Sequence, residues 1–86
     1  MSVAVFVLNV EEFLPLVAHA RERGDIRVSG PLPTGYYRLE AQGQMRIERR
    51  ALGFKHAVWY GLLTGGLVGC IARFDGDELL LQEEGA

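Results

Sequence analysis

The chain has 86 residues, the size of a single small domain, and we expect residues 1–86 to fold as one unit. Hydrophobic residues make up 49% and charged residues 23%, a balance that favours a packed core over disorder. The formal net charge of −2 argues against general nucleic-acid binding, which needs a basic surface, and the single cysteine excludes an intrachain disulfide.

The N-terminal part predicts a buried strand followed by a helix. Val3 to Leu8 is a short apolar run rich in β-branched residues, which is typical of a strand. Asn9 followed by Glu12 is typical of a helix N-terminus, where a capping side chain precedes an acid by three residues. Pro15 does not fit an uninterrupted helix from Asn9. Either the helix is kinked there, or a first turn leads into a helix that starts at Pro15.

The middle of the chain predicts more strands. Ile26–Ser29 is a short strand, and Tyr36–Ala41 and Met45–Arg50 read as a hairpin. A three-residue loop of residues 42–44 puts apolar side chains on one face of this hairpin and opposite charges on the other. This register is therefore favoured over a two-residue loop, which would mix the two faces.

The most distinctive segment is the run from His56 to Ala72, which contains no Asp, Glu, Lys or Arg. We expect a helix over Phe54–Thr64, ended by Gly65-Gly66, and then a buried strand. Because the two glycines interrupt the run near its middle, a membrane-spanning helix is not expected.

The C-terminal part predicts a second hairpin. Leu67–Phe74 and Glu78–Gln82 flank Asp75-Gly76, a strong two-residue turn signal. Cys70 is expected to pack in the first of these strands as a small hydrophobe. The element order is then β-α-β-β-β-α-β-β, an α+β fold with two helices packed on one face of a mainly antiparallel sheet. This order is close to a ferredoxin-like, split βαβ arrangement with extra strands.

Two side chains of the second predicted helix lie off its core stripe. Trp59 and Leu63 are four residues apart on a different strip, and Tyr60 lies beside them. Large aromatic residues anchor protein interfaces, and a chain this small gains stability from a partner. We therefore expect either a broad helix face sunk against the sheet, or a homodimer that forms through Trp59, Tyr60 and Leu63.

A group of cations near the predicted start of the same helix is a candidate ligand site. A helix N-terminus offers unpaired N–H groups and positive potential, so a small anionic ligand could bind there. The residues of this candidate site are Arg49, Arg50, Lys55, His56 and Tyr36, the last as an aromatic wall. The alternative is that these cations pair with the acidic segment 75–84 or remain solvated.

The sequence has neither a metal-binding spacing of His and Cys nor a recognisable nucleophile motif. We therefore expect no metal, no cofactor and no catalytic residue. The favoured interpretation is a small soluble accessory or regulatory protein that self-associates and has no catalytic machinery of its own. The alternative is a ligand-binding protein or enzyme that takes an anionic molecule at the second helix. No signal peptide is evident, so a cytoplasmic protein without nucleic-acid or membrane partners is expected.

Overall fold

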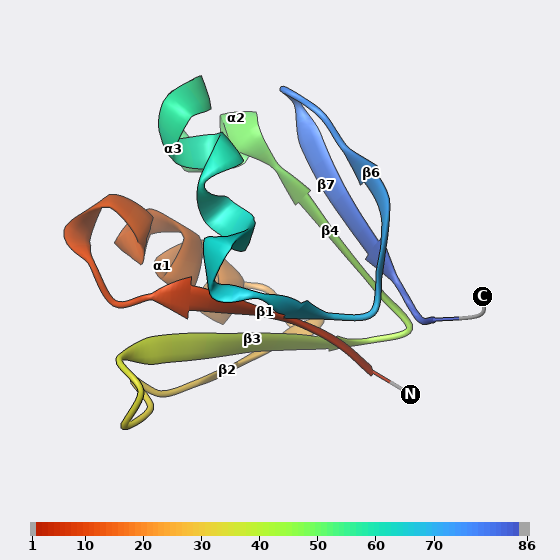
Figure 1. The fold of residues 1–86 in the computed structure, drawn as a ribbon, viewed down its shortest axis with the longest axis horizontal. Coiled ribbons are helices and arrows are strands. Elements are labelled where there is room, and N and C mark those ends of the chain that lie inside the picture. The colour runs from red at the N-terminus through yellow and green to blue at the C-terminus, as the bar shows by residue number, and fades with distance from the viewer. Residues whose placement is uncertain (1, 85–86) are drawn as a thin grey trace.

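The computed structural model describes residues 2–84, which form two antiparallel sheets and several short helices (Figure 1). The first sheet has the order β2-β3-β1-β5 and consists of β1 (Ser2–Leu8), β2 (Ile26–Ser29), β3 (Tyr36–Gln42) and β5 (Leu67–Val68). The second has the order β4-β7-β6 and consists of β4 (Gln44–Glu48), β6 (Cys70–Phe74) and β7 (Glu78–Gln82). The predicted α+β class is confirmed, with the strands divided between two sheets.

The first sheet contains a split βαβ unit. Helix α1 (Leu14–Glu22) connects β1 to β2, and β3 lies between these strands, antiparallel to both. The strand β5 pairs with the free side of β1. This order is compatible with a small ferredoxin-like fold. Alternate residues of β1, among them Val3, Val5 and Val7, are buried toward the helices.

The chain passes from one sheet to the other at two corners. Gly43 joins β3 to β4, and Gly69, whose φ is 116°, joins β5 to β6 (Figure 1). The hairpin predicted for β3 and β4 is therefore wrong, because β4 pairs with β7 instead. The turn at Gly43 directs Met45 and Ile47 into the core between the sheets, where both side chains are completely buried.

The first helix follows the second of the two predicted alternatives. A 3₁₀ turn, η1 (Glu11–Phe13), leads into α1, and Pro15 lies within the first turn of α1. Proline is tolerated there because the N–H group that it lacks has no partner in a first helical turn. Asn9 is not the cap of either helix, since Val10 and Phe13 hold those positions.

The second predicted helix is broken into pieces. The structure has α2 (Arg49–Leu52), α3 (His56–Tyr60) and the 3₁₀ helix η2 (Leu62–Gly65) in place of one helix over residues 54–64. Gly53, with a φ of 69°, ends α2. Since each piece can tilt separately, Phe54, Trp59 and Leu62 all reach the core.

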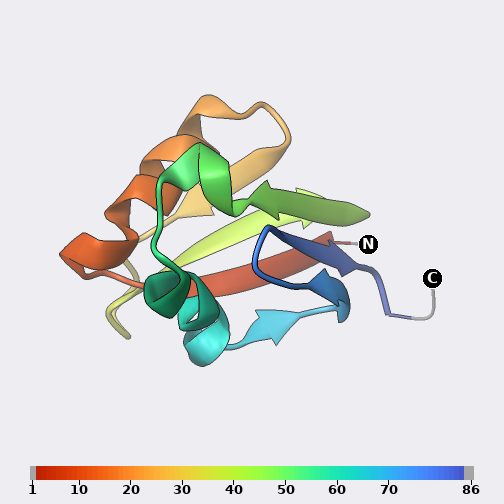
Figure 2. The same cartoon turned by 90° about the horizontal axis from the view of Figure 1, so that it is seen from above.

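The helices α1 and α3 lie on the same face of the four-stranded sheet, and η2 extends α3 down onto β1 (Figures 1 and 2). The second sheet rises from the first at an angle, so that the core fills the space between the sheets and helices. Figure 2 shows β5 and β6 along one side of the molecule, where each is the last strand of its sheet.

The turn between β6 and β7 is longer than predicted. Phe74 is paired with Leu79, whereas a two-residue turn would have paired Ala72 with that residue. The register then shifts again between Ile71 and Arg73, which is a β-bulge. Cys70, expected to be buried, is exposed, because β6 is an edge strand with a neighbour on one side only.

Gly65 allows η2 to lie directly on the first sheet. A Cβ atom at this position would clash with the Phe6 carbonyl oxygen and would lie 2.7 Å from Cε1 of Tyr36. We expect Gly65→Ala to lower the free energy of unfolding, measured by urea denaturation, by roughly 2 kcal/mol or more. Gly24→Ala is the matched control, since nothing lies within 4 Å of its added Cβ. Equal unfolding midpoints for the two variants would contradict this account of the contact.

Candidate interaction site

Trp59 is the centre of the site and connects α3 to the turn between β6 and β7. Its side chain is completely buried, and its Nε1–H donates a hydrogen bond of 2.6 Å to the carbonyl oxygen of Asp75. Its ring also packs on Phe74, with 5.7 Å between the ring centroids. Because an indole N–H needs a partner when it is buried, this bond fixes the distance between the helix and the turn.

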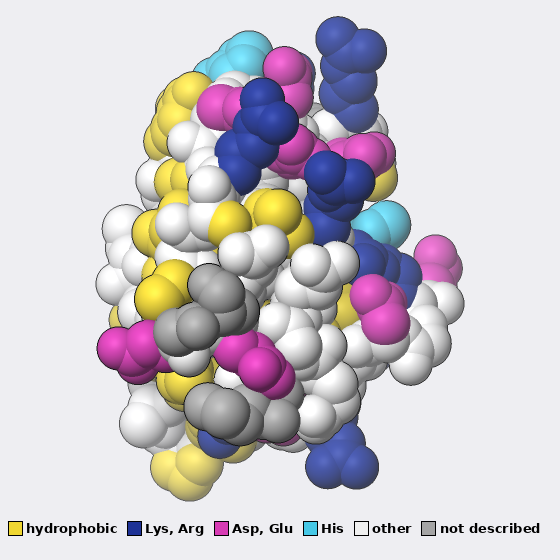
Figure 3. Space-filling model, turned by 90° about the vertical axis from the view of Figure 1, so that its right-hand side faces the viewer, with side chains coloured by type: hydrophobic (Ala, Val, Ile, Leu, Met, Phe, Trp, Pro, Cys, Tyr) yellow, Lys and Arg dark blue, Asp and Glu magenta, His cyan; other side chains and the backbone are white. Residues whose placement is uncertain are grey.

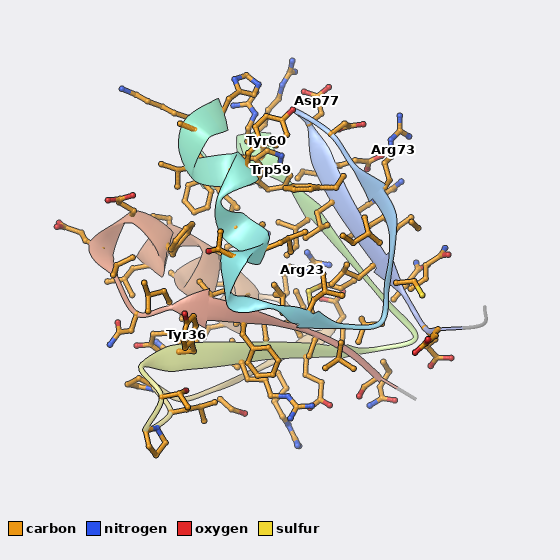
Figure 4. All side chains as sticks on the ribbon, viewed as in Figure 1. Arg23, Tyr36, Trp59, Tyr60, Arg73 and Asp77 are labelled. Carbon is orange, nitrogen blue, oxygen red and sulfur yellow. The ribbon has the colours of Figure 1, made fainter. Side chains whose placement is uncertain are left out.

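Two further rings continue from this anchor to the surface. Tyr60 packs edge-on against Phe74 at 5.7 Å, and His56 stacks on Tyr60 at 6.3 Å. Tyr60 is 53% exposed. Gly76 lies against both side chains, since a Cβ at this position would be 3.3 Å from His56 Nε2 and from the Tyr60 hydroxyl. The helix and the turn thus form one continuous surface, which Figure 4 shows around Trp59 and Tyr60.

Arg49 fixes the same turn from the other side. Its Nε donates to the carbonyl oxygen of Gly76 at 2.6 Å, and its Nη1 donates to that of Phe54 at 2.9 Å. The backbone N–H of Arg49 donates to the carbonyl oxygen of Asp77 at 2.8 Å. This arginine therefore serves as a structural donor to the turn.

Asp75 organises the turn through its own side chain. Its Oδ1 accepts hydrogen bonds of 2.9 Å from the N–H groups of Glu78 and Asp77, and its Oδ2 accepts one of 2.9 Å from Arg73 Nε. These backbone bonds and then the Arg73 guanidinium lower the pKa of Asp75 to about 2. The two backbone bonds also explain the longer turn, because they hold residues 75–78 together as a loop.

Charged side chains surround a shallow hollow of about 400 Å³ at this end of the molecule. Its lining consists of Glu48, Arg50, Arg73, Asp75, Asp77 and Glu78. Glu78 forms two ion pairs, with 3.0 Å between its Oε2 and Arg46 Nε and 3.1 Å between its Oε1 and Arg73 Nη1. Figure 3 shows these charges gathered at the top of one face, with apolar side chains running down the left of that face. The lining has four carboxylates and two guanidinium groups, and Arg46 pairs with one of the carboxylates, which leaves a small excess of negative charge.

The structure does not bring the five predicted anion-site residues together. Tyr36 lies on β3, at the other end of the molecule, where it lines an apolar hollow with Phe6 and Leu32 (Figure 4). The donors of Arg49 are directed at carbonyl oxygens, and Arg50 faces carboxylates. Lys55 and His56 are exposed at the start of α3, which is only five residues long. Arg49 thus contacts the backbone of the acidic segment at Gly76, and Arg50 lines the same hollow as four carboxylates.

The three predicted interface residues are also separated. Trp59 is completely buried by its own chain, so it is not available to a partner. Leu63 is half-buried against the core, and Tyr60 alone of the three is exposed. Burial of Trp59 follows from the break in the helix, because α3 is turned relative to the single helix that the spacing had suggested.

Sequence reasoning missed the part played by Phe74 and by the turn. The acidic character of residues 75–84 and the turn at Asp75-Gly76 were visible, but their contact with α3 was not. The one available signal was a balance of charge, since the basic segment 46–55 needs an acidic neighbour. Nothing in the local sequence indicates that the Trp59 N–H would reach the Asp75 carbonyl.

Within residues 2–84, no cluster of three or more His, Cys, Asp or Glu side chains is arranged to hold a metal ion. No helix in this part of the chain has both the length and the apolar character required to cross a membrane.

No known protein-family model matches the chain, and no curated protein matches it in sequence. Among solved structures, the fold is similar to a chain of "Structure of the Phenol Hydroxylase-Regulatory Protein Complex", with a TM-score of 0.73. The two sequences are 15% identical, and the likeness covers 95% of this chain and 98% of that chain. At this identity the comparison establishes a shared fold, and the neighbour is a regulatory protein.

Removing the Trp59 N–H tests the anchor of the site. We expect Trp59→Phe to lower the free energy of unfolding by about 1–3 kcal/mol, since the Asp75 carbonyl loses its donor and a small cavity remains. Tyr60→Phe, in an exposed ring, should change it by less than about 0.5 kcal/mol. Denaturation with urea measures both changes, and a wild-type midpoint for Trp59→Phe would refute the role of the bond.

The lowered pKa of Asp75 gives the turn a pH dependence with a defined sign. The carboxylate stabilises the fold above its unfolded pKa of about 3.9, and this contribution is lost as pH falls through the folded value of about 2. Asp75→Asn keeps an acceptor oxygen but no charge. We expect the difference in stability between wild type and this variant to shrink between about pH 4 and pH 2. Glu84→Gln, which removes an exposed charge elsewhere, is the control, and identical pH profiles for both variants would contradict the assignment.

Proposed function

We propose that this chain is an accessory or regulatory protein that acts by binding a larger enzyme, in the manner of a regulatory protein that forms a complex with a hydroxylase. The observation that carries the proposal is the likeness to such a protein over nearly the whole length of both chains. Because a fold hosts many functions, the surface has to support the same role.

The surface does support a binding role. Six large apolar side chains among the described residues are exposed, and they fall into two groups by their place in the fold. The first group lies where β1 leads into α1 and consists of Leu8, Val10 and Leu14, each 37–40% exposed. The second belongs to α3 and the strands β5 and β6 and consists of Tyr60, Val68 and Ile71, each 46–53% exposed. Tyr60 is held rigidly between other rings, as anchor residues of interfaces commonly are.

Self-association is the second candidate function. With Trp59 in the core, a homodimer would rest on Tyr60 and the partly buried Leu63. Sedimentation of wild type and of Tyr60→Ser separates this candidate from binding to a larger enzyme. A dimer that Tyr60→Ser dissociates supports self-association, and a wild-type monomer at high concentration excludes it.

The proposal itself is tested by reconstitution. The enzyme that copurifies with the tagged chain is prepared separately, and its turnover is measured while the chain is titrated to a few-fold excess. We expect a saturable change in turnover that ends near one chain per enzyme active unit. A chain that copurifies with no enzyme, or that leaves turnover unchanged at every ratio, contradicts the proposal.

A further inference from the structure

The strand β6 is the open edge of the second sheet. It pairs with β7 on one side, and its residues 70–73 are exposed, with Ile71 at 50%. Gly69 joins β6 to the preceding strand β5, which is an edge strand of the first sheet. The two open edges therefore form one continuous line (Figure 2). Exposed strand edges attract other strands, because their N–H and C=O groups are unpaired.

The opposite edge of the same sheet is covered. Arg23 Nη1 donates a hydrogen bond of 2.5 Å to the backbone carbonyl of Arg46, in the edge strand β4. Asp25 holds that guanidinium in place with hydrogen bonds of 2.9 and 2.7 Å. In the described part of the chain, the side-chain hydrogen bonds to carbonyl oxygens go to Arg46, Phe54, Gly61, Asp75 and Gly76, none of which lies in β6. Arg23 therefore occupies one carbonyl of β4, and within residues 2–84 none of these side-chain bonds occupies a carbonyl of β6.

The side chains along the open edge have an apolar inner row. Phe74 and Ile71 are paired with the buried Leu79 and Leu81, but only Phe74 packs against the core, whereas Ile71 is half exposed at the open edge. Tyr60 packs on Phe74 and extends this row outward. A strand added to β6 would place every second side chain beside Ile71 and Tyr60, and would thus cover apolar surface that water now contacts.

Both ends of β6 are acidic. At the turn end, four carboxylates outnumber Arg50 and Arg73 of the hollow together with Arg46, which pairs with Glu78, and beyond the Cys70 end β7 leads to the exposed Glu84. A second copy paired antiparallel on this edge would bring the turn of each copy, with its excess of carboxylates, toward Glu84 of the other. Because like charges repel, the edge favours a basic partner over another copy of the chain.

We propose that β6 binds an extended segment of a partner protein by strand addition, a segment with alternate apolar side chains flanked by Lys or Arg. This inference rests on the proposed function for the identity of the partner, which is the larger enzyme. Backbone hydrogen bonds would provide affinity, the inner row would select apolar side chains, and the acidic ends would select the flanking cations.

The binding test uses synthetic peptides and two-dimensional NMR of the labelled chain. The probe is a peptide of alternating Val and Thr with Lys at both ends, and its counterpart has Glu at both ends. We expect amide shifts within residues 68–74 on titration, and binding of the Glu peptide weaker by about tenfold or more. Shifts that lie elsewhere, or equal affinities for the two peptides, would overturn the proposal.

Two substitutions make the test specific for the edge. Ile71→Lys adds a cation to the half-exposed inner row and should weaken the Lys peptide by about tenfold or more. Leu14→Lys makes the same change at a residue of similar exposure on α1 and should leave the affinity within about twofold of wild type. A dimer that Ile71→Lys dissociates and that the peptide does not displace would assign the edge to a second copy and overturn the proposal.

The reconstitution assay distinguishes this inference from the proposed function. If Ile71→Lys abolishes the change in turnover and Leu14→Lys does not, both are supported. If Ile71→Lys still changes turnover like wild type, the enzyme docks elsewhere, so the edge proposal is wrong and the proposed function stands. If the peptide binds at β6 but the wild-type chain leaves turnover unchanged, the proposed function is wrong and only the peptide specificity of the edge is supported.

Discussion

The hydrogen bond from the Trp59 indole to the Asp75 carbonyl is the constraint on which the rest of this structure depends. It joins a five-residue helix, too short to be stable alone, to a turn between two strands of the other layer. The largest buried side chain thereby contacts both layers at once. Once this distance is set, Phe74 and Tyr60 can stack outward, and the turn comes within reach of Arg49.

Charge reinforces this arrangement without creating it. Arg49 donates to a carbonyl oxygen of the turn, while Arg46 and Arg73 pair with Glu78. The arginines of these ion pairs are more than half exposed, so solvent screens the pairs and each contributes little to stability by itself. Their effect is to orient the turn and to place its remaining carboxylates outward. An acidic surface patch results from the way the turn is held together.

The parts of the fold that the sequence predicted are those with local signals. The strand at Val3 to Leu8 lies where its pattern placed it, the helix follows one of its two predicted starts, and the turn begins at Asp75 as predicted although it is longer. The errors concern pairings between distant segments. The predicted hairpin over residues 36–50 sorted apolar and charged side chains onto separate faces, but β4 pairs with β7 and buries Met45 and Ile47 between the two sheets instead.

The candidate site was partly visible for the same reason. The cations at 46–55 and the acids at 75–84 were evident as complementary charges, whereas the exposure of β6 depends on which strand ends a sheet. Strand order is a property of the whole chain, so no local pattern encodes it. The apolar stretch from Leu67 to Ala72 looks buried in composition, but residues 70–72 are exposed because the sheet stops there.

The arginine that covers β4 has a consequence for stoichiometry. A sheet with two open edges can be extended from both sides, and such extension has no natural end, which is how fibres grow. A sheet with one edge covered and the other open can accept an added strand on one side only. A strand added to β6 would leave this sheet with β4 as its remaining edge strand, where Arg23 holds one carbonyl. Arg23, far from the open edge in the fold, thus limits how many molecules can join there.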